Sequence, residues 1–113
     1  MDERVPPHRV VLMTAGSPEE AERLARALVG ERLVACVNIV GPIRSIYRWQ
    51  GQVEDSTEQL LIAKTLAGLV PRLAERVKAL HSYEVPEVLA IPILYGWPPY
   101  LAWVESETQA AGN

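Results

Sequence analysis

The chain has 113 residues, 49% hydrophobic and 22% charged, a composition that predicts one globular domain with a core rather than a disordered or fibrous chain. Its net charge of −3 gives no electrostatic footprint for nucleic acid or an anionic membrane, and no apolar run is long enough to span a bilayer. The single cysteine, Cys36, excludes an intramolecular disulfide framework, and the acidic, proline-containing N-terminus does not resemble a secretory signal, so we expect a cytoplasmic protein.

The first third of the chain predicts a strand followed by an amphipathic helix. Arg9–Thr14 is a compact, mostly apolar run that contains β-branched residues, as strands do. Ser17 is the expected helix N-cap, with a proline in the first turn and Glu20 three residues after the cap, the spacing of a capping box. Apolar residues then recur on one helical face from Ala21 to Val29, and Gly30 is the expected stop.

The middle of the chain predicts a long β-hairpin. Leu33–Val40 shows little alternation, so we expect a strand covered on both faces or buried at one end, with Cys36 as a buried, inert packing residue. A further strand, Ile43–Trp49, is followed by the turn signal Gln50-Gly51 and a returning strand that continues to Lys64-Thr65. The polar tips of these strands would project beyond the core, and such an arm predicts a partner subunit that stabilises it.

The last third predicts a helix, a strand and a short helix. The apolar spacing from Leu69 to Leu80 predicts a second amphipathic helix that ends near His81. Val88–Leu94 is the next strand, and Pro92 favours an edge position or a bulge because it cannot donate a ladder hydrogen bond. Two prolines, Pro98 and Pro99, open a helix through Val104. Residues 1–8 and 106–113 are expected to be loose termini.

This order of elements, β-α-β-β-α-β-α, predicts an α+β fold. Its natural architecture is the split βαβ, or ferredoxin-like, sandwich, in which two helices cover one face of an antiparallel sheet. No linker or low-complexity block divides the chain, so we expect one domain over residues 1–113.

The residue patterns that carry enzymatic chemistry are missing from the sequence. It contains no phosphate-binding loop, no dinucleotide fingerprint and no nucleophile elbow. We therefore expect no catalytic residue, no cofactor-binding residue and no enzyme. The acidic residues Glu54, Asp55 and Glu58 are expected to be solvated on the hairpin stem, and the three tryptophans to pack in a core or an interface.

The segment His81-Ser82-Tyr83-Glu84-Val85-Pro86-Glu87-Val88 has two interpretations. Imidazole and carboxylate ligands suit zinc or copper, which would make the segment a metal site. The spacing matches no known ligand pattern, however, and His81 at a helix C-terminus followed by an extended stretch before proline is equally typical of a helix–strand junction.

Several separated motifs resemble the CutA family of divalent-cation tolerance proteins. They run in order from about Val10 to Trp103: ACVNI at residues 35–39, SIYRWQG at 45–51, IAKT at 62–65, HSYEVPE at 81–87 and YLAW at 100–103. The resemblance implies a ferredoxin-like subunit in a homotrimer similar to the PII signalling proteins, with strands paired between subunits. It also implies a cytoplasmic protein that responds to metal ions and binds copper or another divalent metal. We expect the chain to fold without this metal.

The copper ligands of the family carry over only in part. In the members of the CutA family that are proposed to bind copper, the ligands are a cysteine on the first strand and two adjacent histidines at the end of the second helix, and the resemblance implies the same positions here. Here Met13 takes the first position, and the histidine pair is reduced to Leu80 and His81. The usual proline after the histidine is Ser82. Since a thioether binds Cu(I), Met13 and His81 are the expected metal ligands.

The second hypothesis is a PII-like sensor or protein-interaction module in which metal is incidental. In this interpretation, an inter-subunit cleft receives a small anion or a partner. Hydrolase activity ranks below both hypotheses because no pair of a nucleophile and a general base can be identified in the sequence. The expected partner is the chain itself, without nucleic acid or membrane. The residues expected in the cleft are Trp49, Lys64, Tyr83, Glu84, Glu87 and Trp103.

Overall fold

The computed structural model describes residues 6–108, so the parts of the expected loose termini at 1–5 and 109–113 lie outside the described residues. Its elements follow the predicted order. They are β1 (His8–Ala15), α1 (Pro18–Gly30), β2 (Cys36–Trp49), β3 (Gln52–Leu66), the 3₁₀ turn η1 (Ala67–Leu69), α2 (Val70–Leu80), β4 (Val88–Pro92) and α3 (Pro98–Thr108).

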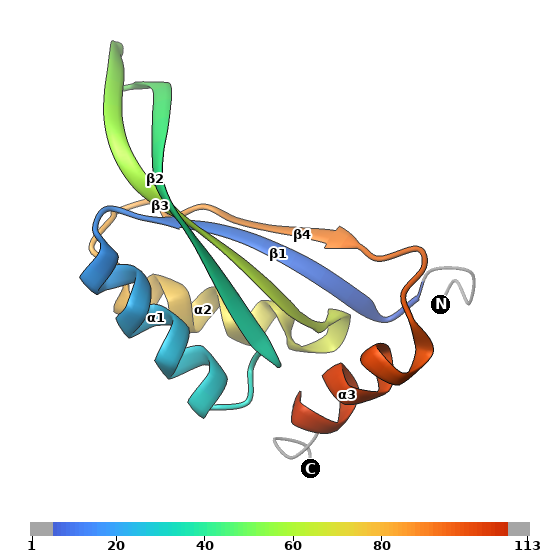
Figure 1. Cartoon of the computed structure of the whole chain (residues 1–113). Coiled ribbons are helices and arrows are strands. Elements are labelled where there is room, and N and C mark those ends of the chain that lie inside the picture. The colour runs from blue at the N-terminus through green and yellow to red at the C-terminus, as the bar shows by residue number, and fades with distance from the viewer. Residues whose placement is uncertain (1–5, 109–113) are drawn as a thin grey trace.

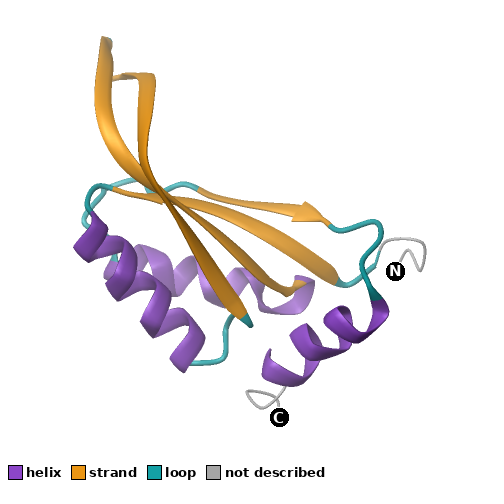
Figure 2. Ribbon diagram, in the orientation of Figure 1, coloured by secondary structure: helices purple, strands orange, loops and turns teal. Residues whose placement is uncertain are grey.

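The four strands form one antiparallel sheet in the order β2-β3-β1-β4. This order confirms the ferredoxin-like split βαβ sandwich, because the strands that each of α1 and α2 connects are separated by one intervening strand. Figures 1 and 2 show α1 and α2 side by side on one face of the sheet, with α3 beside its far end. Both β2 and β4 are edge strands, so the edge position expected from Pro92 is confirmed.

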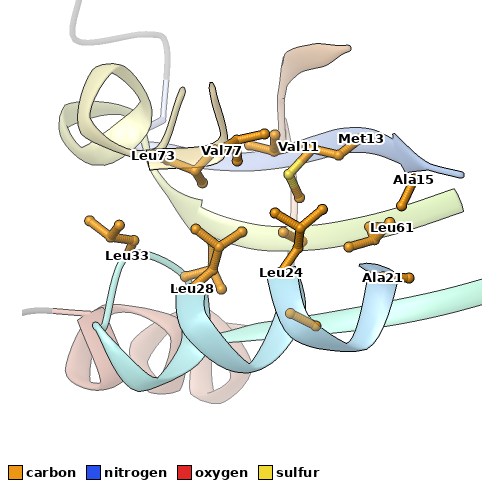
Figure 3. Packing of buried hydrophobic residues seen from close by; sticks show 13 residues of the cluster. Val11, Met13, Ala15, Ala21, Leu24, Leu28, Leu33, Leu61, Leu73 and Val77 are labelled. Carbon is orange, nitrogen blue, oxygen red and sulfur yellow. The ribbon is translucent and has the colours of Figure 1, made fainter. Parts of the chain in front are cut away.

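The hydrophobic core lies between the sheet and the helices α1 and α2 (Figure 3). Alternate residues of β1 and β3 point into it, and each helix contributes the apolar stripe that its spacing predicted. The fully buried members include Val11, Met13, Leu24, Leu28, Leu61, Leu73 and Val77. None of the helices within residues 6–108 has the length and apolarity needed to cross a bilayer.

The hairpin of β2 and β3 extends past the helices as an arm, residues 43–58 (Figure 1). Its turn has positive φ at both central residues, 50° at Gln50 and 81° at Gly51, as a type I′ turn requires. The register between β2 and β3 shifts between Val40 and Ile43. At this irregularity a Cβ on Gly41 would overlap the end of the Gln59 side chain, which would have to move to make room for it.

Five sequence-based expectations were wrong in detail. β2 begins at Cys36, and Cys36 is only partly buried because β2 is an edge strand exposed along most of its length. β4 ends at Pro92, two residues before the expected Leu94. The last helix continues to Thr108, whose side chain is buried and whose hydroxyl donates to the Val104 carbonyl oxygen at 2.9 Å. His8 is the buried first residue of β1, not part of a loose terminus.

Candidate functional site

A pocket of 680 Å³ lies where the arm leaves the body of the protein, beside the segment that follows α2. We call it the arm pocket. Three parts of the chain build it: the arm, the paired residues Thr14 of β1 and Leu60 of β3 beside the arm, and residues 83–87. Its lining residues are Thr14, Ile43, Ser45, Ile46, Tyr47, Trp49, Glu58, Leu60, Tyr83, Glu84, Val85 and Glu87.

Every charged side chain in this lining is a carboxylate: Glu58, Glu84 and Glu87. Glu58 is 7% exposed, and its Oε2 accepts a hydrogen bond of 2.7 Å from the Tyr83 hydroxyl. Burial raises the pKa of Glu87 above its ordinary value, and the negative charge of Glu58 raises it further. The pocket therefore disfavours anions and provides a negative potential for a cation.

Tyr83 is held in a fixed position in the lining of the arm pocket. Its ring lies against Gly16, where an added Cβ would come within 3.2 Å of the hydroxyl oxygen. Burial raises the pKa of the Tyr83 hydroxyl far above its ordinary value, and the hydrogen bond to Glu58 adds to this effect. At neutral pH the phenol therefore keeps its proton and acts as a hydrogen-bond donor to Glu58.

The structure brings four of the six expected cleft residues together. Trp49, Tyr83, Glu84 and Glu87 all line the arm pocket. Lys64 does not, because it lies further along β3 and donates a hydrogen bond to the Asn38 side chain on β2. Trp103 is on α3, paired with Tyr100 at a ring-centroid distance of 5.5 Å, and is also absent from the lining.

His81 and Met13, the expected copper ligands, are placed very differently from an open metal site. The His81 side chain is fully buried, its Nε2–H donates to the Thr14 carbonyl at 2.7 Å, and its Nδ1 accepts from the Tyr83 backbone N–H at 3.0 Å. Both ring nitrogens are thus engaged in hydrogen bonds, which leaves no lone pair for a metal. Met13 lies within the core (Figure 3). This arrangement does not fit a Cu(I) site.

Glu20 is a site residue that sequence reasoning assigned only to a capping box. The Ser17 hydroxyl does accept from the Glu20 backbone N–H at 3.1 Å, as the motif predicts. The Glu20 carboxylate instead accepts from the Gly16 N–H at 3.3 Å and from the N–H and hydroxyl of Ser82 at 2.7 and 3.0 Å. It therefore ties the start of α1 to the segment after α2, next to the pocket residue Tyr83.

Glu58 and Tyr47 were not singled out as pocket residues from the sequence. The expectation that Glu58 is solvated was wrong, whereas Asp55 is exposed and forms a bidentate ion pair with Arg44 at 2.6 and 3.0 Å. The β2–β3 register pairs Glu58 with Ile43 and Tyr47 with Glu54, which places these side chains on one face of the arm. That register, which sequence alone did not fix, is the signal that would have identified them.

Comparison with known proteins agrees with the fold. The family model described as CutA1 divalent ion tolerance protein matches residues 9–107. The divalent-cation tolerance protein CutA of Thermus thermophilus is 54% identical over 88% of this chain and 96% of its own length. Protein CutA of Mus musculus is 46% identical over 89% of this chain, which spans only 57% of the mouse protein.

Solved structures give the same result. The structure of the Thermus thermophilus divalent cation tolerance protein has a TM-score of 0.87 at 53% identity and covers 89% of this chain and 98% of its own. The Oryza sativa CutA1 structure has a TM-score of 0.89 at 45% identity and covers 95% of this chain and 98% of its own.

Proposed function

The chain belongs to the CutA1 divalent ion tolerance protein family, and we propose that it helps cells to tolerate divalent cations. In this proposal it is a homotrimeric binding protein of the cytoplasm. The arm pocket carries this proposal. Its charged groups are all carboxylates, which suits a protein that recognises positive charge. The cytoplasmic compartment is supported by the single, unpaired cysteine, although the rice relative is named chloroplastic and the Archaeoglobus structure periplasmic.

A binding role suits the pocket better than catalysis. Catalysis by nucleophile and base needs a side chain that gives up its proton readily. In the arm pocket the hydroxyl nearest a buried carboxylate is that of Tyr83, and its raised pKa keeps it protonated. The pocket groups thus provide charge and hydrogen bonds, and we infer that the protein acts by binding.

A trimer is supported by the two open edges of the sheet. Within residues 6–108, β2 and β4 each have one unpaired edge, and large apolar side chains on them are exposed, among them Ile39, Val40, Leu89 and Ile91. Edge strands of this kind pair with other chains. Because the two edges differ, pairing β2 of one subunit with β4 of the next is a head-to-tail contact, and with a rotation of about 120° between subunits it forms the ring of three that we propose. Light scattering on the purified chain should return the mass of three subunits.

The cellular function can be tested by growth. We expect the wild-type chain, expressed in cells that lack their own CutA-family protein, to extend growth to higher concentrations of copper, zinc or cobalt salts. The Glu58→Gln variant removes the buried charge of the pocket at constant shape, and we expect it to lose this benefit. The Asp55→Asn variant, which changes an exposed carboxylate outside the pocket, is the matched control. Unchanged growth with the wild-type chain would contradict the proposal.

The copper site expected at His81 and Met13 stays a prediction, and the hydrogen bonds of His81 argue against it. We expect Cu(I), Cu(II) and Zn(II) titrations to give the same stoichiometry and affinity for the wild type and for His81→Asn. The reason is that a metal on either ring nitrogen would have to displace the Thr14 or the Tyr83 hydrogen bond. Loss of one equivalent of bound Cu(I) in the variant would restore His81 as a ligand.

A second candidate function is that of a PII-like small-ligand sensor, and the size of the arm pocket favours it. A volume of 680 Å³ is within the range of pockets that hold small organic molecules. The small anion expected as its ligand fits poorly, because the lining offers carboxylates and the expected cation Lys64 lies elsewhere.

A further inference from the structure

Glu58 is the most buried of the three carboxylates in the arm pocket. Its carboxylate is 7% exposed, and Tyr83 donates to only one of its two oxygens. Within residues 6–108, no lysine, arginine or histidine nitrogen lies within 4.0 Å of this carboxylate. A buried carboxylate that lacks a counter-charge is costly, and a bound cation would remove that cost.

Aromatic rings form a second feature of the same pocket. Trp49 and Tyr47 lie two residues apart on β2, so both side chains point to the same face of the arm, and both line the pocket. Each is more than 40% exposed in the single subunit. Ring faces attract cations, and most strongly in the case of tryptophan. The rings and the carboxylates thus favour the same class of ligand.

The pocket does not have the donor arrangement of a metal site. A metal ion needs several ligands converging at about 2 to 2.6 Å. Among the described residues, no group of three or more histidine, cysteine, aspartate or glutamate side chains is placed to hold one. At 680 Å³ the pocket is also far larger than a bare ion. Charge, aromatic surface and volume together suit a cation that carries hydrocarbon.

We propose that the arm pocket binds a small organic ammonium ion, with its charged head group at Glu58 and Glu87 and its methyl or methylene groups against Trp49. This inference rests on the second candidate function, in which the pocket is a ligand site. The proposed ligand class is thus an organic cation in place of the small anion expected from the sequence. It also makes the response to divalent cations indirect, because the pocket then senses an organic cation rather than the metal.

Calorimetric titration of the full-length protein with matched probes tests the proposal. Choline and 3,3-dimethylbutan-1-ol have the same shape and differ in charge, so their comparison isolates the cation. We expect choline to bind at least about tenfold more tightly than the alcohol. Glu58→Gln and Trp49→Leu should each weaken choline binding by about tenfold, whereas Asp55→Asn should leave it unchanged. Thermal unfolding of each variant checks that the fold is retained, and Glu87→Gln is a second charge variant if Glu58→Gln unfolds.

Four other binding results would each contradict the proposed organic ammonium site in a different way. Equal affinity for choline and the alcohol would show a ligand site that is not selective for cations. Binding of acetate or inorganic phosphate in place of choline would restore the anion hypothesis. Glu58-dependent binding of Mn²⁺ or Zn²⁺ with no choline binding would make the pocket a metal site. If no probe binds, the pocket is not a ligand site, and the growth experiment still decides the role in cation tolerance independently.

Discussion

Replacing Glu20 by glutamine should lower the free energy of unfolding by about 2 kcal/mol at neutral pH, the range expected for hydrogen bonds to a charged group. The carboxylate is 6% exposed and accepts three hydrogen bonds, one from Gly16 and two from Ser82. It also lies 3.4 Å from the His81 ring. Glutamine has the same shape but turns an NH₂ group toward these donors, so at least one of them loses its acceptor while it stays buried.

The loss should depend on pH in a direction set by the pKa of Glu20. Burial opposes the charged form of this carboxylate, but the hydrogen bonds from Ser82 and Gly16 together outweigh burial, so the folded-state pKa lies below the ordinary value. A lowered pKa stabilises the fold at every pH above the unfolded-state pKa, and this stabilisation disappears as the pH falls through the folded-state pKa. The difference between wild type and variant should therefore be full at neutral pH and shrink in acid.

Guanidinium chloride unfolding at a fixed protomer concentration, repeated from neutral to acidic pH, measures this difference. Glu19→Gln is the matched control, since Glu19 is the exposed neighbour in the same helical turn and should change stability by only a few tenths of a kcal/mol. A Glu20→Gln difference that is absent at neutral pH, or that is the same at every pH, would show that the hydrogen-bonded charge does not stabilise this junction.

The architecture could be predicted from the sequence because its signals are local. The apolar spacing of α1 and α2, the N-cap at Ser17 and the turn at Gln50-Gly51 depend on near neighbours in the chain, and all three are confirmed. Element ends were less accurate. α3 extends to Thr108 because its end is buried against the body of the protein, and a contact of that kind has no local signature.

The candidate site was predicted only in part because burial depends on what lies opposite a residue. Glu20 and Glu58 have mostly polar neighbours in the sequence, which predicts exposure. Both are nevertheless buried by segments that are distant along the chain. Lys64 was expected in a cleft between subunits and stays a prediction there; within one chain the β2–β3 register places it beside Cys36 and Asn38. The junction after α2, in contrast, was recognised directly, and Tyr83, Glu84 and Glu87 do meet there.

The exposure of β2 and β4 leads to the second large effect, on assembly. Ile91 is 46% exposed on β4, in register with Val10 of β1, and Leu89 two residues earlier points to the same open face. If subunits pair through these edges, Ile91→Asp places a carboxylate in an apolar interface, where an unpaired charge costs several kcal/mol. Light scattering at micromolar concentration should then detect monomers in place of trimers, while the far-ultraviolet circular dichroism spectrum keeps its mixed α and β shape.

Val29 provides the matched control for this experiment. It is 42% exposed, close to the value for Ile91, but lies on α1, away from both edges of the sheet. Val29→Asp introduces the same charge at a similarly exposed apolar position, so it should leave the trimer intact. A trimer that survives Ile91→Asp would remove β4 from the interface, and dissociation of both variants would assign the effect to added negative charge. Dissociation of the Ile91 variant alone would place β4 in the contact that closes the ring.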